Sequence, residues 1–136
     1  MLLLDLIEKY CEKDGDEYIT HDHYFKVEPS SEEALKSFKK HCLKYGIEDR
    51  ICAELLDLYR QSNSLFNFFT CDDEIIFEWW QDSKELWLGN LDMDTFRYSA
   101  ERRKYSIGDA SNFSYGEEYE FDTLEDMIEA YVKECS

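Results

Sequence analysis

The stretch from Lys84 to Ile107, KELWLGNLDMDTFRYSAERRKYSI, decides the fold class of this 136-residue chain. Three short runs of apolar and aromatic residues occupy 84–88, 95–99 and 104–107. Turn residues separate the runs, and Gly89 with Asn90 closes the first of them. Short strand-like runs divided by turns are typical of an antiparallel β-meander. We therefore expect an antiparallel sheet in this part of the chain.

Upstream of the sheet, the spacing of apolar residues predicts helices. Residues 2–12 have the pattern of a short amphipathic helix, and another helix is expected at about 48–61. Between them, a further helix is expected to begin at Ser30. Ser30 and Glu33 have the spacing of a capping box, with Ser30 as the N-cap. Gly46 is suited to end that helix, because glycine adopts the left-handed conformation of a helix C-terminus.

Other segments complete the fold prediction. Residues 17–27 are rich in β-forming residues and predict one strand. The aromatic run Ser64–Thr70 and the stretch Glu74–Trp80, EIIFEWW, also have the character of strands, and Tyr119–Phe121 is a candidate edge strand. A closing amphipathic helix follows the cap Thr123. The expected fold is therefore α+β, a twisted antiparallel sheet packed with N-terminal helices and a C-terminal helix.

The length of the chain indicates one domain, residues 1–136, with residues 1–30 as an N-terminal extension. Its net charge is −17, and residues 71–136 hold −12 of it. So negative a chain is repelled by nucleic-acid backbones and anionic membranes and is attracted to basic proteins. We expect a basic protein partner, no nucleic acid and no membrane. A role in solubility alone is the alternative explanation of the charge.

The number and spacing of the cysteines indicate the cellular compartment of the protein. The five cysteines are odd in number and include no Cys-x-x-Cys pair, so neither a disulfide framework nor a zinc knuckle is indicated. The apolar start, Met1 to Leu4, lacks the basic residues of a signal peptide, and no run has transmembrane length. These features predict a reduced, cytoplasmic protein.

Candidate catalytic and metal-binding residues are few. In a strand, His21 and His23 point to the same face, but two ligands are too few for a metal centre. The acidic stretch from Asp92 to Asp94 lacks the glycine and the terminal glutamate of a calcium loop. Neither a nucleophile elbow nor a phosphate-binding glycine loop occurs. We expect neither enzymatic activity nor a cofactor, with a small carboxylate enzyme as the minor alternative.

Three tryptophans cluster in the second half of the chain, at Trp79, Trp80 and Trp87. Core packing on one face of the sheet explains most such clusters. The alternative is that one tryptophan lies on an open face and anchors a binding surface, since tryptophan is enriched at binding hot spots.

The second half of the chain resembles the SUKH superfamily of Smi/Knr type. The resemblance covers about residues 50–134. It rests on LWLG at 86–89, IGDA at 107–110, SYG at 114–116 and YEFDTLED at 119–126.

The resemblance implies an α+β fold without catalytic residues. Bacterial members are commonly immunity proteins, which bind polymorphic toxins of nuclease or deaminase type and occlude them. On this reading an acidic face covers a basic cleft of the toxin, and charge accelerates association. The expected partner-binding residues are the acids Asp72, Asp73, Asp92, Asp94, Glu117 and Glu118, with Trp79 or Trp80 as an apolar anchor.

Another kind of interaction module fits the same features. A regulatory scaffold needs only a binding face, and an acidic DNA mimic presents carboxylates at near-phosphate spacing along an elongated face. An exposed sheet edge also leaves pairing between copies of the chain open.

Overall fold

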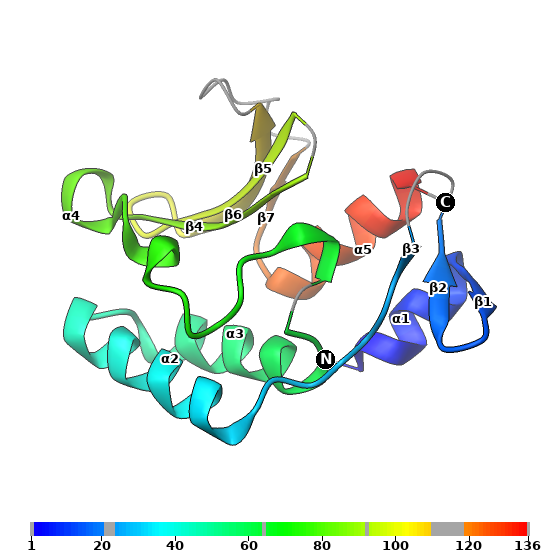
Figure 1. Cartoon of the computed structure of the whole chain (residues 1–136). Helices are drawn as coiled ribbons and strands as arrows, with labels where there is room; N and C mark the ends of the chain where they lie inside the picture. Colours follow the sequence, from blue (N-terminus) through cyan, green and yellow to red (C-terminus); the bar gives the residue numbers. More distant parts are fainter. Residues whose placement is uncertain (1, 21–23, 64, 92, 110–118, 136) are drawn as a thin grey trace.

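The main sheet is the antiparallel meander that the sequence predicts (Figure 1). The computed structural model describes residues 2–20, 24–63, 65–91, 93–109 and 119–135. The strands, in spatial order, are β4 (Glu85–Leu91), β5 (Asp94–Ser99), β6 (Lys104–Asp109) and β7 (Glu120–Phe121). The α+β fold is therefore confirmed, and the candidate edge strand is β7, which pairs with β6.

The two faces of this sheet differ in chemistry because side chains alternate along each strand. One face is apolar and buried, and it holds Leu86, Leu88, Phe96, Tyr98, Tyr105 and Ile107. On the other face, Trp87 on β4 is directly opposite Arg97 on β5, and Arg97 is opposite Ser106 on β6. The core lies on the first face, and the second face holds the residues considered below as a site.

Five α-helices accompany the sheets within the described residues. They are α1 (Leu3–Tyr10), α2 (Glu32–Tyr45), α3 (Asp49–Gln61), α4 (Trp80–Ser83) and α5 (Leu124–Cys135). In Figure 1, α2 and α3 lie side by side below the main sheet, and α5 lies near β7. Tyr131 of α5 meets Phe96 of β5 edge to face at 4.9 Å, so α5 packs on the apolar face.

The N-cap of α2 is Ser31, and the prediction of Ser30 is wrong by one residue. The Ser31 side chain accepts a hydrogen bond from Ala34 N at 3.1 Å. Ser30 is instead buried against the end of α3, where its hydroxyl donates to Asn63 Oδ1 at 2.8 Å. Tertiary packing of Ser30 therefore moves the helix start by one residue. Gly46 ends α2 in the left-handed conformation, as predicted.

The N-terminal segment forms a small sheet of its own. Its strands are β1 (Glu12–Asp14), β2 (Glu17–Ile19) and β3 (Tyr24–Phe25). The prediction of one strand over 17–27 is wrong, because this range contains two strands, β2 and β3, which pair antiparallel with each other. Gly15, with φ of 65°, allows the tight turn between β1 and β2. Helix α1 contacts α5, which connects this part of the chain to the rest.

The stretch Glu74–Trp80 is helical, and its prediction as a strand is wrong. It forms a 3₁₀ helix, η2 (Glu74–Phe77), and then enters α4. Asp73 starts η2 by accepting a hydrogen bond from Ile75 N at 3.0 Å. Ile76, Phe77 and Trp80 are all buried in this helical arrangement. A short apolar run is compatible with a strand or a helix, and here the capping aspartate and the packing select the helix.

Gly89 lies inside a strand and does not close it, which corrects the prediction made for Gly89 and Asn90. Strand β4 continues to Leu91, with a register shift between Trp87 and Gly89. Phe68 forms an antiparallel bridge to Gly89, directly after the 3₁₀ helix η1 (Leu65–Asn67). The aromatic run 64–70 therefore contributes one bridge, not a full strand. A Cβ at Gly89 would lie 2.6 Å from Phe68 Cα, so the close backbone approach requires glycine.

Candidate functional site

The structure separates the predicted partner-binding residues. Asp72 and Asp73 are exposed in the turn before η2, and Trp79 is half-buried directly before α4. Trp80 is only 6% exposed, so it belongs to the core and does not present its ring to a partner. Asp72, Asp73 and Trp79 thus lie on one short acidic segment of the surface.

The other predicted residues do not join this group. Asp94 is half-buried at the start of β5, and its carboxylate accepts a hydrogen bond from the Tyr131 hydroxyl at 3.3 Å. This contact ties Asp94 to α5. Asp92, Glu117 and Glu118 lie outside the described residues.

An aromatic stack lies on the second face of the main sheet. The rings of Trp79 and Trp87 are parallel within 6°, with centroids 4.4 Å apart. Phe69 meets Trp87 edge to face at 4.9 Å, and the Trp87 indole N–H donates to Asn90 Oδ1 at 2.8 Å. Because Trp87 is fixed on both sides, it supports Trp79 as a rigid and partly exposed surface.

Arg97 is the residue of this site that the sequence prediction missed. Its guanidinium carbon lies 5.1 Å from the centroid of the Trp79 ring, which is the geometry of a cation–π contact. Arg97 Nη2 donates to the Asp109 carbonyl at 3.3 Å, and Nη1 lies 3.9 Å from Glu85 Oε2. The residue is only 9% exposed. Its position opposite Trp87 depends on the strand register, which no local pattern in the sequence specifies.

A pocket of about 450 Å³ opens beside these groups and is lined by Trp79, Ser83, Glu85 and Arg97. We call it the Arg97 pocket. The Ser83 hydroxyl is turned back onto the Trp79 carbonyl, with an Oγ–O distance of 2.9 Å. The pocket therefore combines an aromatic wall, a cation and a carboxylate within one surface depression.

The segment around Trp79 is strongly acidic. Residues 71–85 contain six acids and one base. Asp72, Glu78 and Asp82 are all exposed, and none of the described residues forms an ion pair with them. An exposed carboxylate without a cationic neighbour remains available to a basic partner. We call Asp72, Asp73, Glu78 and Asp82, together with Trp79, the acidic binding surface.

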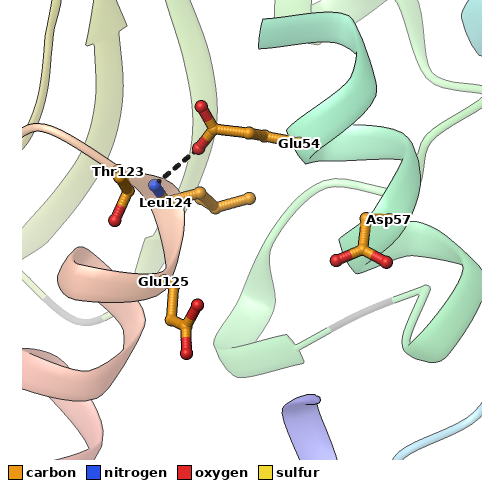
Figure 2. Close-up of a pocket in the computed structure, with 5 residues that line it drawn as sticks. All are labelled: Glu54, Asp57, Thr123, Leu124 and Glu125. Atoms are coloured by element: carbon orange, nitrogen blue, oxygen red, sulfur yellow. Dashed lines mark hydrogen bonds between the residues drawn. The ribbon is translucent and has the colours of Figure 1, made fainter. Parts of the chain in front are cut away.

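A second pocket, of about 190 Å³, lies between α3 and the start of α5 (Figure 2). Glu54 points toward α5, where its Oε2 accepts from Leu124 N at 2.9 Å. Its other oxygen accepts from Arg50 Nη1 at 3.1 Å. Asp57 and Glu125 also line this pocket (Figure 2). One oxygen of Glu54 thus holds α3 to the start of α5, and the other pairs with Arg50 within α3, so Glu54 has a structural role.

The buried cysteines are poor nucleophiles in this environment. Burial raises the pKa of the Cys42 thiol, with a further contribution from the Cys52 thiol, and burial also raises the pKa of Cys71. Both thiols are therefore protonated at neutral pH, whereas nucleophilic cysteines need a lowered pKa. His41, the sequence neighbour of Cys42, faces Glu74, with Nε2 3.0 Å from Oε1.

Neither a metal centre nor a membrane-spanning helix occurs in the described part of the chain. Within the described part of the chain, no three His, Cys, Asp or Glu side chains are arranged to hold a metal ion. His21 and His23, the pair weighed as metal ligands, lie outside the described residues. None of the helices in the part of the chain that the structure describes is long and apolar enough to span a bilayer.

Comparisons with protein-family models, with curated proteins and with solved structures gave no match to this chain. The resemblance to the SUKH superfamily therefore stays a prediction from the sequence.

Proposed function

We propose that this chain is a non-enzymatic, cytoplasmic immunity protein that binds a basic toxin domain and covers its functional surface. The observation that supports the proposal is the acidic binding surface, in which exposed carboxylates lie on the same short segment of the chain as the half-buried Trp79. The acidic binding surface supports binding of a basic protein, whereas the immunity role and the nuclease or deaminase type of the toxin come from the SUKH resemblance alone.

The chemistry of this surface suits protein binding. A hot spot is commonly an aromatic side chain on a rigid support with polar residues around it, and Trp79 on Trp87 has this arrangement. The surrounding acids supply electrostatic complementarity to a basic partner. The net charge of −17 acts in the same direction at longer range and raises the association rate.

The proposal is tested first by recovering the partner. The tagged chain is purified from its native host at low and high salt, and the retained proteins are identified. We expect a basic toxin domain that high salt releases. Expressed alone, that domain should arrest growth, and one equivalent of this chain should neutralise it in cells and in vitro. Retention of a partner whose activity the chain does not inhibit would contradict the immunity proposal.

Variants then test the location of the surface. The triple variant D72N/E78Q/D82N removes three exposed acids and leaves Trp79 in place. The control variant E12Q/D14N/E28Q removes three exposed acids elsewhere, so both proteins have the same net charge. Taking each exposed pair at about 0.5 kcal/mol, the loss of three pairs is about 1.5 kcal/mol, so we expect the first variant to bind the toxin about tenfold more weakly and the control to bind almost normally. Equal losses in both variants would show that only overall charge matters.

A further inference from the structure

The guanidinium of Arg97 has fewer partners than its burial requires. It carries five N–H donors, yet its contacts are one hydrogen bond, to the Asp109 carbonyl, a long ion pair with Glu85 and the stack on Trp79. Glu85 lies 3.9 Å from Nη1, which is beyond hydrogen-bond distance. The buried Nε atom has no hydrogen-bond partner among the described residues. A cation that is 91% buried is thus left with incomplete compensation.

We propose that the Arg97 pocket is a carboxylate-binding site. The ligand's carboxylate accepts hydrogen bonds from Nη1 and draws it away from Glu85, and the ligand's apolar part lies on Trp79. The volume of about 450 Å³ is within the range of small-molecule sites, roughly 300–1,000 Å³. Trp79 belongs to both this pocket and the acidic binding surface, but the proposal does not depend on toxin binding, because its test needs only the protein and a small acid.

The choice of a carboxylate follows from charge and shape. The planar guanidinium presents parallel N–H donors, which match the two oxygens of a carboxylate. A phosphate dianion fits less well, because Glu85 lines the same pocket and the whole chain has a net charge of −17. A neutral ligand would not compensate the cation. A singly charged carboxylic acid has two oxygens for the guanidinium, only one negative charge near Glu85, and the charge that Arg97 requires. A flat apolar group on this acid can lie on Trp79.

The probe is benzoate, with benzamide as its neutral counterpart of similar shape and phenyl phosphate as the dianion. Binding is followed by NMR of the ¹⁵N-labelled protein, through the indole N–H signals of Trp79 and Trp87 and the Nε–H signal of Arg97. We expect saturable shifts with benzoate and an affinity at least about tenfold higher than for benzamide, as charge-assisted hydrogen bonds are the stronger ones. Phenyl phosphate should bind more weakly than benzoate.

Two variants make the test specific. E85Q removes the competing carboxylate and keeps the side-chain size, so benzoate should bind about tenfold more tightly, consistent with the strength of a close charge pair. R97M should lose benzoate binding, provided that its circular dichroism spectrum matches that of the parent protein. If R97M does not fold, E85Q decides the question alone.

The same chemistry can come from a free small acid or from the end of a peptide chain. N-acetylphenylalanine copies a chain end, and tighter binding than benzoate would assign the site to peptide termini, whereas weaker binding would assign it to small acids. Shifts that are the same for benzoate and benzamide, or no saturable shift with benzoate in the parent and in E85Q, would overturn the proposal.

Discussion

The substitutions Y59F and Y105F, made separately, each remove one phenolic hydroxyl, and the two hydroxyls lie in different environments. Both side chains are 0% exposed, and both rings pack against an aromatic neighbour. The Tyr59 hydroxyl donates to the Phe69 carbonyl at 3.0 Å. The Tyr105 hydroxyl has no hydrogen-bond partner among the residues that the structure describes. The two substitutions should therefore change stability in opposite directions.

The magnitudes follow from the hydrogen-bond inventory. Y59F leaves the Phe69 carbonyl without its partner, so the free energy of unfolding should fall by about 1–2 kcal/mol. Y105F removes a buried hydroxyl whose desolvation is not offset, a penalty of roughly 1–3 kcal/mol in protein mutational data, so the free energy of unfolding should rise by about 1 kcal/mol. The difference between the variants is then about 2–3 kcal/mol.

Urea unfolding at pH 7, monitored by circular dichroism and tryptophan fluorescence, measures both values. The slope of free energy against urea concentration should stay constant, so the midpoint alone reports stability. In thermal unfolding, 1 kcal/mol corresponds to about 4 °C for a chain of this size. If Y105F destabilises the protein as much as Y59F does, the Tyr105 hydroxyl is hydrogen-bonded in solution and the reasoning is refuted.

Three further predictions concern other parts of the chain. G89A should lower the free energy of unfolding by about 1–3 kcal/mol in urea unfolding, because the new Cβ meets the backbone of Phe68 at 2.6 Å; unchanged stability would contradict this close approach. S31A should cost about 1 kcal/mol through loss of the N-cap, measured by the same assay, and an S31D variant should recover most of it. Stability should also fall above about pH 8.5, because burial raises the pKa values of Cys42 and Cys71, so the unfolded chain releases these protons first. The slope should approach about 1.4 kcal/mol per pH unit per group, and C42A should reduce it.

The elements with strong periodic patterns were predictable. The apolar stripes of α2, α3 and α5, the cap Thr123 and the turns between β4, β5 and β6 are all local signals, and the structure contains each of these elements. The start of α2 was misplaced because two adjacent serines have equal capping chemistry. Only the packing of Ser30 against Asn63, 33 residues away, distinguishes them.

The candidate site was less predictable, for a related reason. Trp79 and the acids Asp72 and Asp73 were identified from residue type alone, and they do lie on one segment. Trp80 is not distinguishable from Trp79 by residue type, and the strand that the pattern predicts does not form; the helical turn buries the Trp80 ring and leaves the Trp79 ring partly exposed. Arg97 could not be identified, since its place beside Trp79 depends on the long-range register of β4 and β5.

The two proposed binding functions respond in opposite ways to the charge of the same segment. Glu78 is adjacent to Trp79 in the chain and Asp82 is adjacent to Ser83, so both lie near the Arg97 pocket. Their charges attract a basic protein and repel a carboxylate over about one Debye length, roughly 8–10 Å at moderate salt. The variant D72N/E78Q/D82N should therefore bind the toxin about tenfold more weakly and benzoate about two- to threefold more tightly at low salt.

Salt provides the control for this pair of measurements. At 0.5 M NaCl, screening should reduce both differences toward zero, because the Debye length falls to roughly 4 Å. E12Q/D14N/E28Q, with the same net charge, should change neither affinity by more than about twofold at low salt. A variant in which both ligands bind more weakly would indicate that the segment has lost its structure, which the unfolding curve would show independently. If the structure is intact and the two affinities still move together, the acids and the Arg97 pocket do not form the electrostatic arrangement argued here.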